Sequence, residues 1–362
     1  MRIRTSNSSF GDCGDNHFTM GLKRRFVDPR GLEPLTFPMP WGRATNYAMG
    51  PSRFLILPKI FLCYHWFNMT NITKAVIAAA GRGTRFLPVV KSYPKELVPI
   101  LSKPNIQYLI EEAIGAGITE IAIVHRLGEN SIEKYFTPDA DLENYLTQNN
   151  KLEYLDSLKA IWSKAKLTFI PQPTNLPYGN GSPILAAKEF IGSSDFVYMF
   201  GDDLTVEPVA GQFLSKMMTT FDQYQPASVI AVKDVGREEI SRYGSAQYVE
   251  DPKYPHRISA MLEKLPADQA PSTFGQGGRF VISNKVINIL ENQSTGLGNE
   301  LWLADAQNNM AKNDVVLTQA FEGVEDWLTT GDPLRWLQAN ITVALQDPKF
   351  KDDLTQFIKN LK

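Results

Sequence analysis

The sequence predicts an α/β fold in which helices cover both faces of a largely parallel β-sheet, and two observations support this prediction. From Met69 onward, short apolar runs typical of strands alternate with amphipathic runs typical of helices. The chain has 362 residues, of which 43% are hydrophobic, so it can bury a sizeable core. Its length fits one large domain or two ordinary ones.

The expected elements follow from these runs in order. The strand-like runs are KAVIAAA (74–80), EIAIVH (120–125), LTFI (167–170), FVYMF (196–200), ASVIAV (227–232) and ISAMLEK (258–264). The predicted helices are 106–116, 131–136, 141–148, 151–165, 183–190, 333–346 and 352–362. An open α/β sheet binds ligands at the carboxyl ends of its strands, so polar residues directly after a strand are candidate site residues.

Residues 1–68 differ from the rest of the chain. They carry nine Lys and Arg against four Asp and Glu, and they lack sustained periodicity. Their apolar run 54–67 is shorter than the roughly 20 residues of a spanning helix, and no apolar segment of a secretory signal follows the charged start. We expect either a poorly structured extension or a translation start placed too early, with Met69 as the natural first residue. The folded domain is then 69–362.

Composition excludes several classes of function. A net charge of −2 gives no basic face for nucleic acid, so nucleic acid is not expected as a partner. Because the apolar run 54–67 is too short to span a membrane, no membrane partner is expected either, and a cytoplasmic location is predicted. Both cysteines lie within residues 1–68, which leaves the domain without a thiol nucleophile or a zinc cluster. His125 and His256 stand in no metalloprotease spacing. Any chemistry must rest on Asp, Glu, Lys, Arg and bound metal.

The glycine-rich turn after the first strand is the strongest local signal. Gly81 and Gly83 let backbone N–H groups approach a phosphate closely, although an ordinary tight turn is the alternative. The Walker A spacing is absent, and Phe86 stands where the dinucleotide fingerprint has its third glycine. Arg85 and Lys95 follow as two full positive charges that can stabilise a triphosphate as it reacts.

A second signal follows the strand-like run 196–200. Asp202 comes just after this run and offers a hard oxygen ligand for Mg2+, with a solvated loop acid as the alternative. Asp203 is expected to point to the opposite side and to be solvated.

The stretch 81–108 has the form GRGTRFLPxxKxxPKELxPIxxKPxIQY. It closely resembles the sugar-1-phosphate nucleotidyltransferase family, in particular the bacterial branch that uses UTP and glucose 1-phosphate, and the resemblance extends over Lys74–Asn340. It implies a three-layer α/β/α, Rossmann-like domain with a mixed, mostly parallel central sheet. It also implies Mg-dependent transfer of a uridylyl group from UTP to glucose 1-phosphate, in a homo-oligomer (dimer or tetramer). The alternatives are another nucleoside triphosphate or sugar 1-phosphate, or a non-catalytic regulator that binds a sugar nucleotide.

The resemblance also implies roles for individual residues. The catalytic cations are Arg85, Lys95 and Lys264. The nucleotide-binding residues are Ala79, Ala80, Gly81, Gly83, Thr84, Gln172 and Gly179. The sugar-binding residues are Gly244, Glu263 and Lys264, and the metal ligands are Asp202 and Asp305. For Asp305, an acid on a helix surface is the alternative.

One segment departs from the family pattern. Gln172 and Gly179 align only if about two extra residues are allowed within 172–183. Ser182 is expected to cap the helix that follows, with Pro183 at its first position.

Overall fold

The computed structural model describes residues 71–156 and 164–361. The predicted extension, residues 1–68, lies outside the described residues, and so does the middle of the predicted helix 151–165. The statements below concern the described residues, all of which belong to one compact unit.

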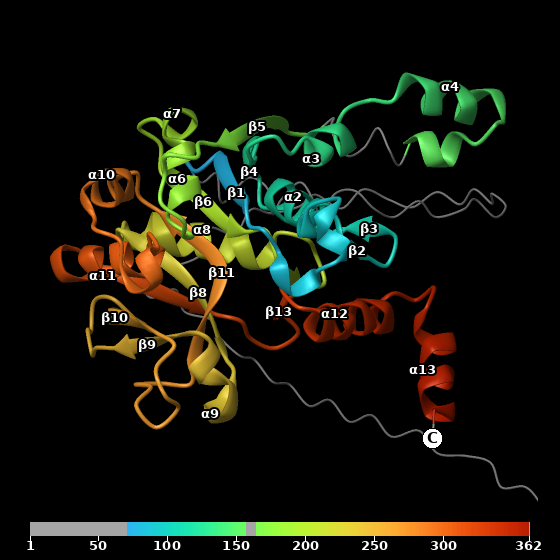
Figure 1. The fold of residues 1–362 in the computed structure, drawn as a ribbon. Coiled ribbons are helices and arrows are strands. Elements are labelled where there is room, and N and C mark those ends of the chain that lie inside the picture. Colours follow the sequence, from blue (N-terminus) through green and yellow to red (C-terminus); the bar gives the residue numbers. More distant parts are fainter. Residues whose placement is uncertain (1–70, 157–163, 362) are drawn as a thin grey trace, which may run out of the picture. The chain divides into compact units, whose positions relative to one another are not determined.

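A nine-stranded sheet forms the centre of the fold (Figure 1). Its main path runs in the order β10 (Ile258–Glu263), β9 (Gly244–Tyr248), β11 (Phe274–Ile282), β6 (Phe196–Phe200), β1 (Lys74–Ala79), β4 (Glu120–Arg126) and β5 (Lys166–Gln172). The strand β8 (Ser228–Asp234) pairs with β11, and β12 (Val316–Ala320) pairs with β8. The pairs β6–β1, β1–β4, β4–β5 and β8–β12 are parallel. The strand β11 is antiparallel to β6, β8 and β9, and β10 is antiparallel to β9. The predicted mixed, mostly parallel sheet is confirmed.

Helices cover both faces of this sheet, because its buried strands are apolar on both sides. In β4, Ile121 and Ile123 enter one core cluster, while Ala122 and Val124 enter the other. The first face is covered by α2 (Asn105–Gly115), α3 (Ser131–Tyr135) and α8 (Gln212–Tyr224). The second is covered by α6 (Ser182–Ala186), α7 (Lys188–Ile191), α10 (Lys285–Asn292) and α11 (Leu303–Asn313). This is the three-layer arrangement that the family resemblance implied.

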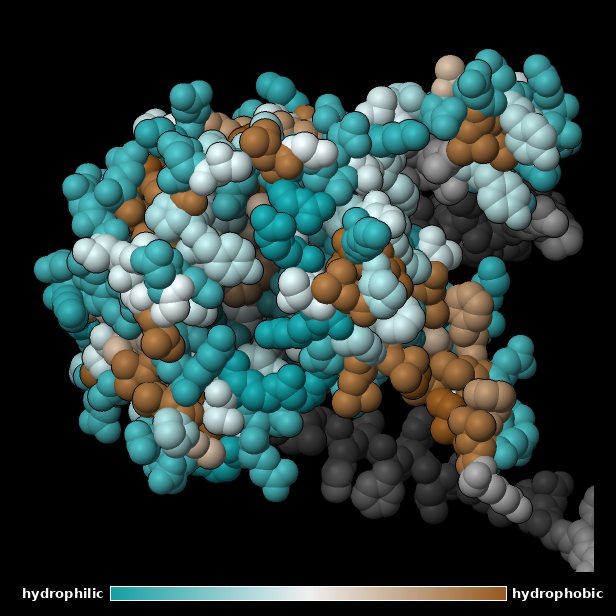
Figure 2. Space-filling view, in the orientation of Figure 1, coloured by the Kyte–Doolittle hydropathy of each residue, from teal (hydrophilic) through white to brown (hydrophobic). Residues whose placement is uncertain are grey.

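Smaller elements surround the sheet. They are η1 (Thr84–Phe86), η2 (Val89–Lys91), η3 (Lys95–Leu97), β2 (Pro99–Ile100), β3 (Lys103–Pro104), α4 (Ala140–Gln148), β7 (Asp203–Val206), α9 (Gly236–Glu239), η4 (Ile240–Arg242), η5 (Leu297–Asn299), β13 (Asp326–Thr329), α12 (Pro333–Gln346) and α13 (Lys351–Asn360). Strands β7 and β13 pair with each other, which sets Thr329 beside Asp203. Hydrophobic side chains gather over α12 and α13 (Figure 2). None of the described helices is both long and apolar enough to cross a membrane.

The prediction of a single helix over 183–190 is wrong. The structure has two short helices there, α6 and α7, which meet at Ala187. The predicted cap is also displaced by one residue, because Ser182 is already helical and Gly181 precedes it. The Ser182 hydroxyl donates to the Pro177 carbonyl at 2.5 Å, so a loop oxygen engages it instead of a helix N–H.

Candidate active site

A cavity of about 380 Å3 opens at the carboxyl ends of β1 and β6. Most of the predicted site residues line it, and these are Ala80, Gly81, Arg85, Lys95, Gln172, Gly179, Asp202, Gly244, Glu263 and Lys264. Ala79, Gly83, Thr84 and Asp305 do not line it. The fold therefore brings together residues that lie as far apart in the sequence as Ala80 and Lys264.

The glycine turn lies against the side chain of Lys95. Gly83 has a φ of 59°, a left-handed conformation that favours glycine. A Cβ at Gly83 would lie 3.1 Å from the Lys95 Cβ, and one at Gly81 would lie 3.4 Å from the Lys95 Cε. The absence of these side chains leaves a channel along which the lysine extends into the cavity.

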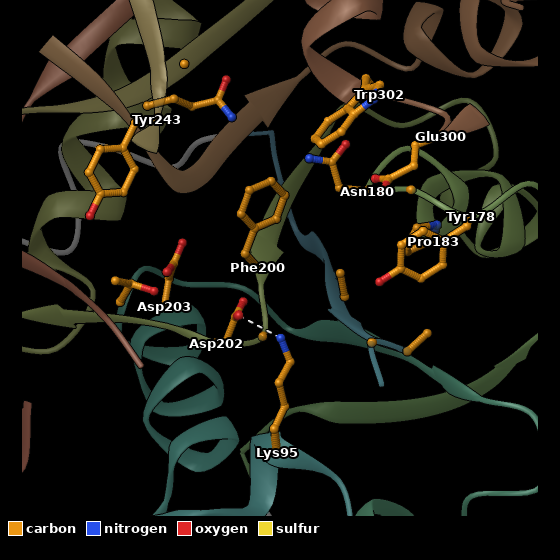
Figure 3. A pocket seen from close by; sticks show the side chains of 18 of the residues that line it. Lys95, Tyr178, Asn180, Pro183, Phe200, Asp202, Asp203, Tyr243, Glu300 and Trp302 are labelled. Atoms are coloured by element: carbon orange, nitrogen blue, oxygen red, sulfur yellow. Dashed lines mark hydrogen bonds and ion pairs between the residues drawn. The ribbon is translucent and has the colours of Figure 1, made fainter. Parts of the chain in front are cut away.

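Lys95 and Asp202 form an ion pair in the cavity (Figure 3). The Lys95 Nζ donates to the Asp202 Oδ2 at 2.6 Å and lies 4.0 Å from the Glu96 Oε1. Burial alone would raise the pKa of Asp202, but the charges of Lys95 and Arg85 outweigh burial and lower it. Burial would likewise lower the pKa of Lys95, yet the neighbouring carboxylates raise it. Both groups are therefore charged at neutral pH.

Asp203 is buried, so the prediction of a solvated side chain is wrong. The chain does not continue β6 but turns at Gly201 and Asp202, and Asp203 begins β7. Only 5% of Asp203 is exposed, and a Cβ at Gly278 would lie 2.0 Å from its Oδ2. Burial, reinforced by the Asp202 charge, raises the pKa of Asp203 to about 7.

Glu96 is a second buried acid in the cavity wall. Neither of its carboxylate oxygens has a hydrogen-bond partner in the part of the chain that the structure describes. Burial raises its pKa to about 7, against the opposing effect of the Lys95 charge.

Glu263 and Lys264 lie together at the end of β10, as predicted. Gly244 pairs with Glu263 across β9 and β10, and a Cβ at Gly244 would lie 3.1 Å from the Glu263 Oε1. Burial raises the pKa of Glu263, although the Lys264 charge opposes this. The Lys264 ammonium lies 5.1 Å from the centroid of the Trp302 ring, a cation–π distance that steadies this exposed side chain.

Gln172 and Gly179 also line the cavity. The Gln172 Oε1 is buried and has no hydrogen-bond partner among residues 71–156 and 164–361. Gly179 has a φ of 134°, and a Cβ there would lie 2.4 Å from the Leu301 carbonyl oxygen. Leu301 accepts from the Gly181 N–H at 2.9 Å and donates to the Tyr178 carbonyl at 2.7 Å. The loop before α6 is thus fastened to the segment before α11.

Several lining residues were missed from the sequence, and Figure 3 shows most of them around Phe200. They include Tyr178, Asn180, Phe200, Arg242, Gln276, Glu300, Trp302, Trp327 and Thr329. Gln276 gave one usable signal, since it is the single amide in the run 274–282, whose other residues are apolar or glycine except for Arg279.

Asp305 is exposed in the first turn of α11, near Gly296, and the fold does not bring it to the cavity wall that holds Asp202. Within the described ranges there is no cluster of three or more His, Cys, Asp or Glu side chains that could hold a metal by itself.

Comparison with known proteins identifies the family. The model for nucleotidyl transferases matches residues 74–345. The chain belongs to the nucleotidyl transferase family. This nucleotidyl transferase is 35% identical to a UTP–glucose-1-phosphate uridylyltransferase of Staphylococcus haemolyticus, over 81% of its own length and 99% of the relative. It is 37% identical to UTP–glucose-1-phosphate uridylyltransferase 2 of Streptococcus pyogenes, over 81% of this chain and 97% of the relative.

A solved structure agrees with these relatives. The fold is similar to that of a UTP-bound UGPase from Acinetobacter baumannii, with a TM-score of 0.72 and 32% identity. The match covers 80% of this chain and 100% of that one. The nucleotidyl transferase domain therefore spans the whole length of its relatives.

Proposed function

We propose that this chain transfers a uridylyl group from UTP to glucose 1-phosphate, which gives UDP-glucose and pyrophosphate. The observation that carries the proposal is the arrangement of one cavity. The Lys95–Asp202 pair lies in it together with the Gln172 amide oxygen, which has no partner among the described residues, and the acid–lysine pair Glu263–Lys264. The names of the related proteins, and the UTP bound by one of them, support the same substrates.

Gln172 suits recognition of the uracil base. Its buried Oε1 can accept one hydrogen bond, and the N3–H of uracil is a single donor between two carbonyl groups. Cytosine has an acceptor at the same ring position, so it would leave the amide oxygen unpaired in a buried site, which is costly. The backbone of Ala80 and Gly81 lines the same cavity and can lie against the nucleotide.

The chemical step requires no side-chain nucleophile. An oxygen of the sugar phosphate attacks the α-phosphorus of UTP, a new P–O bond forms, and the bond to the bridging oxygen of pyrophosphate breaks. Lys264 holds the attacking phosphate, while Arg85 and Lys95 neutralise the charge that moves onto the departing pyrophosphate. Glu263 accepts hydrogen bonds from sugar hydroxyls.

Mg2+ fits the residues of this cavity. It is usually bound by one or two carboxylates together with waters and substrate phosphates, so a complete protein cage is not needed. Asp202 lines the cavity and its pKa is lowered, so it is assigned as the protein ligand, whereas the exposed Asp305 does not line the cavity. When bound with the triphosphate, Mg2+ supplies neutralising positive charge and orients the phosphates.

A homo-oligomer is proposed as well. Large apolar side chains are exposed on α12 and α13, among them Leu334, Leu337 and Phe357 at 62%, 48% and 59%. Apolar patches of this kind often mark protein–protein contacts. Light scattering on the native chain and on Leu337→Glu tests this, with a loss of mass expected for the variant.

The cytoplasmic location stays a prediction.

The function is tested by measuring pyrophosphate release over a grid of nucleoside triphosphates and sugar 1-phosphates, with and without Mg2+. We expect the fastest Mg-dependent release with UTP and glucose 1-phosphate. Faster turnover of another pair would keep the chemistry and replace the substrates. No turnover with any pair, combined with tight binding of UDP-glucose, would instead identify a regulator.

A further inference from the structure

Gln276 is a buried amide in the wall of the cavity. It lies in β11 and is only 8% exposed. Its Oε1 is buried and has no hydrogen-bond partner in the described part of the chain. Buried carbonyl groups are almost always paired, because an unpaired acceptor loses its bond to water without a replacement. An amide left in this state beside a cavity indicates a ligand with a hydrogen-bond donor.

The strand register places Gln276 in a row with two sugar-side residues. Gly275 pairs with Ser245 in the antiparallel contact of β11 and β9, so Gln276 lies across from Gly244. Gly244 in turn pairs with Glu263 on β10. Cross-strand neighbours point to the same face of a sheet, and the two outer strands of the row are about 10 Å apart. All three residues line the cavity.

The missing side chain of Gly244 opens a strip between the amide and the carboxylate. Glu263 leans over this strip, since a Cβ at Gly244 would lie 3.1 Å from its Oε1. Gln172 lies far along the same sheet, on β5, with β6, β1 and β4 between it and β11. Gln276 therefore faces the sugar and not the base.

We infer that Gln276 is a specificity-determining residue that accepts a hydrogen bond from one hydroxyl of the hexose. Because the proposed function supplies the sugar, this role depends on it. Glu263 and Gln276 then approach the ring from two sides, and both present acceptors to hydroxyl donors. A sugar that lacks the hydroxyl facing Gln276 leaves the amide unpaired and is rejected. A sugar with a carboxylate at that position is rejected as well, because the carboxylate has no proton to donate and would face the acceptor oxygens of Glu263 and Gln276.

The test compares glucose 1-phosphate with its 2-, 3-, 4- and 6-deoxy analogues, in the native chain and in Gln276→Leu. In the native chain, kcat/KM should be about tenfold or more lower for one deoxy analogue than for glucose 1-phosphate, and this loss should exceed the losses for the other analogues. In Gln276→Leu that preference should fall to about twofold, because glucose 1-phosphate itself loses the contact. The KM for UTP should be unchanged. Gln276→Met is a second variant of similar volume in case the leucine packs poorly.

Gln307→Leu is a matched control. Gln307 is 1% exposed and its amide atoms also lack hydrogen-bond partners in the described residues, yet it does not line the cavity. This variant should keep every preference of the native chain.

The outcomes separate the two levels of the proposal. Turnover of the native chain with glucose 1-phosphate, measured first, tests the proposed function by itself, and its absence would overturn both. Normal turnover with all four preferences intact in Gln276→Leu and Gln276→Met would overturn only the role of Gln276. A raised KM for UTP with an unchanged sugar preference would do the same, since it would assign the amide to the nucleotide.

Discussion

Lys95 and Asp202 hold each other in the cavity, with the Lys95 Nζ 2.6 Å from the Asp202 Oδ2. The lysine is assigned to the triphosphate and the aspartate to Mg2+, so each is paired in this structure with a group that substrate binding must displace. On substrate binding, phosphate would take the place of the carboxylate beside the lysine, and the cation would take the place of the lysine beside the carboxylate. Each group would then keep a partner of opposite charge. The pair thus keeps the two proposed catalytic groups ionised and oriented before the substrates bind.

Asp202→Asn removes the charge and keeps the shape of the side chain. We expect turnover to fall by about a hundredfold or more at saturating Mg2+, because the metal loses its charged protein ligand. Steady-state kinetics measure this, and the far-ultraviolet circular dichroism should be unchanged. Asp305→Asn is the matched control and should stay close to the native rate. If the two variants were equally impaired, Asp202 could not be the principal ligand.

Replacement of Lys264 and replacement of Lys95 should affect different substrates. Lys264→Ala should raise the KM for glucose 1-phosphate, whereas Lys95→Ala should mainly slow the chemical step and weaken UTP or pyrophosphate. A charged hydrogen bond to phosphate contributes roughly 1.5–3 kcal/mol, so each effect should exceed about tenfold. Kinetics with each substrate varied in turn decide the matter. Equal changes in both Michaelis constants for Lys264→Ala, at constant turnover, would contradict its assignment to the attacking phosphate.

Gly179→Ala should destabilise the chain and impair UTP binding. Its φ of 134° strains any other residue, and the new Cβ would lie 2.4 Å from the Leu301 carbonyl oxygen. Gly128→Ala is the control, because Gly128 also has a positive φ of 80° but nothing lies within 4 Å of a Cβ there. We expect a cost of about 1 kcal/mol for Gly128→Ala and a clearly larger one for Gly179→Ala, measured by urea denaturation. Equal decreases in the free energy of unfolding would show that the loop can move to accommodate the new Cβ at position 179.

Glu96 should make the stability fall as the pH rises. Burial raises its pKa to about 7 in the folded chain, from an ordinary value of 4.5. Between these values the folded state binds more protons than the unfolded state, so the free energy of unfolding decreases from about pH 4.5 to pH 7. Glu96→Gln should reduce this slope, and Asp203 should account for part of what remains.

Urea midpoints at pH 5 and pH 8 measure the difference between the two chains. Glu133→Gln, at an exposed position of α3, controls for the loss of one negative charge. An identical slope in the native chain and in Glu96→Gln would show that Glu96 does not bind the extra proton.

The charged residues of the site were predictable because their chemistry leaves a local pattern. A glycine turn with cations behind it in the sequence is a pattern typical of phosphate binding, and here Arg85 follows the turn directly while Lys95 comes later in the same stretch. Asp202 was found because it directly follows a strand at the ligand-binding edge of the sheet. These signals depend on neighbours in the sequence, so they can be recognised without the tertiary structure.

Other features depended on residues far away in the sequence. Asp203 is buried only because Gly278, on another strand, leaves room for its carboxylate. The strand β11 is buried on both faces and contains three glycines, so it shows no alternation of apolar and polar residues. The same absence of alternation hid the direction in which Gln276 points.

The attachment of Gly181 and Tyr178 to Leu301 has an evolutionary consequence. Gln172 is held at the end of β5, and the loop is held again from Tyr178 onward, so the residues between them connect two fixed points. Insertions or deletions in that connection change its length without moving either wall of the cavity. The resemblance aligns Gln172 and Gly179 with the family pattern only if about two extra residues are allowed between them, which is where this connection lies. The proposed contact of Gln172 with the base can therefore be kept in relatives whose connection between these two fixed points differs in length.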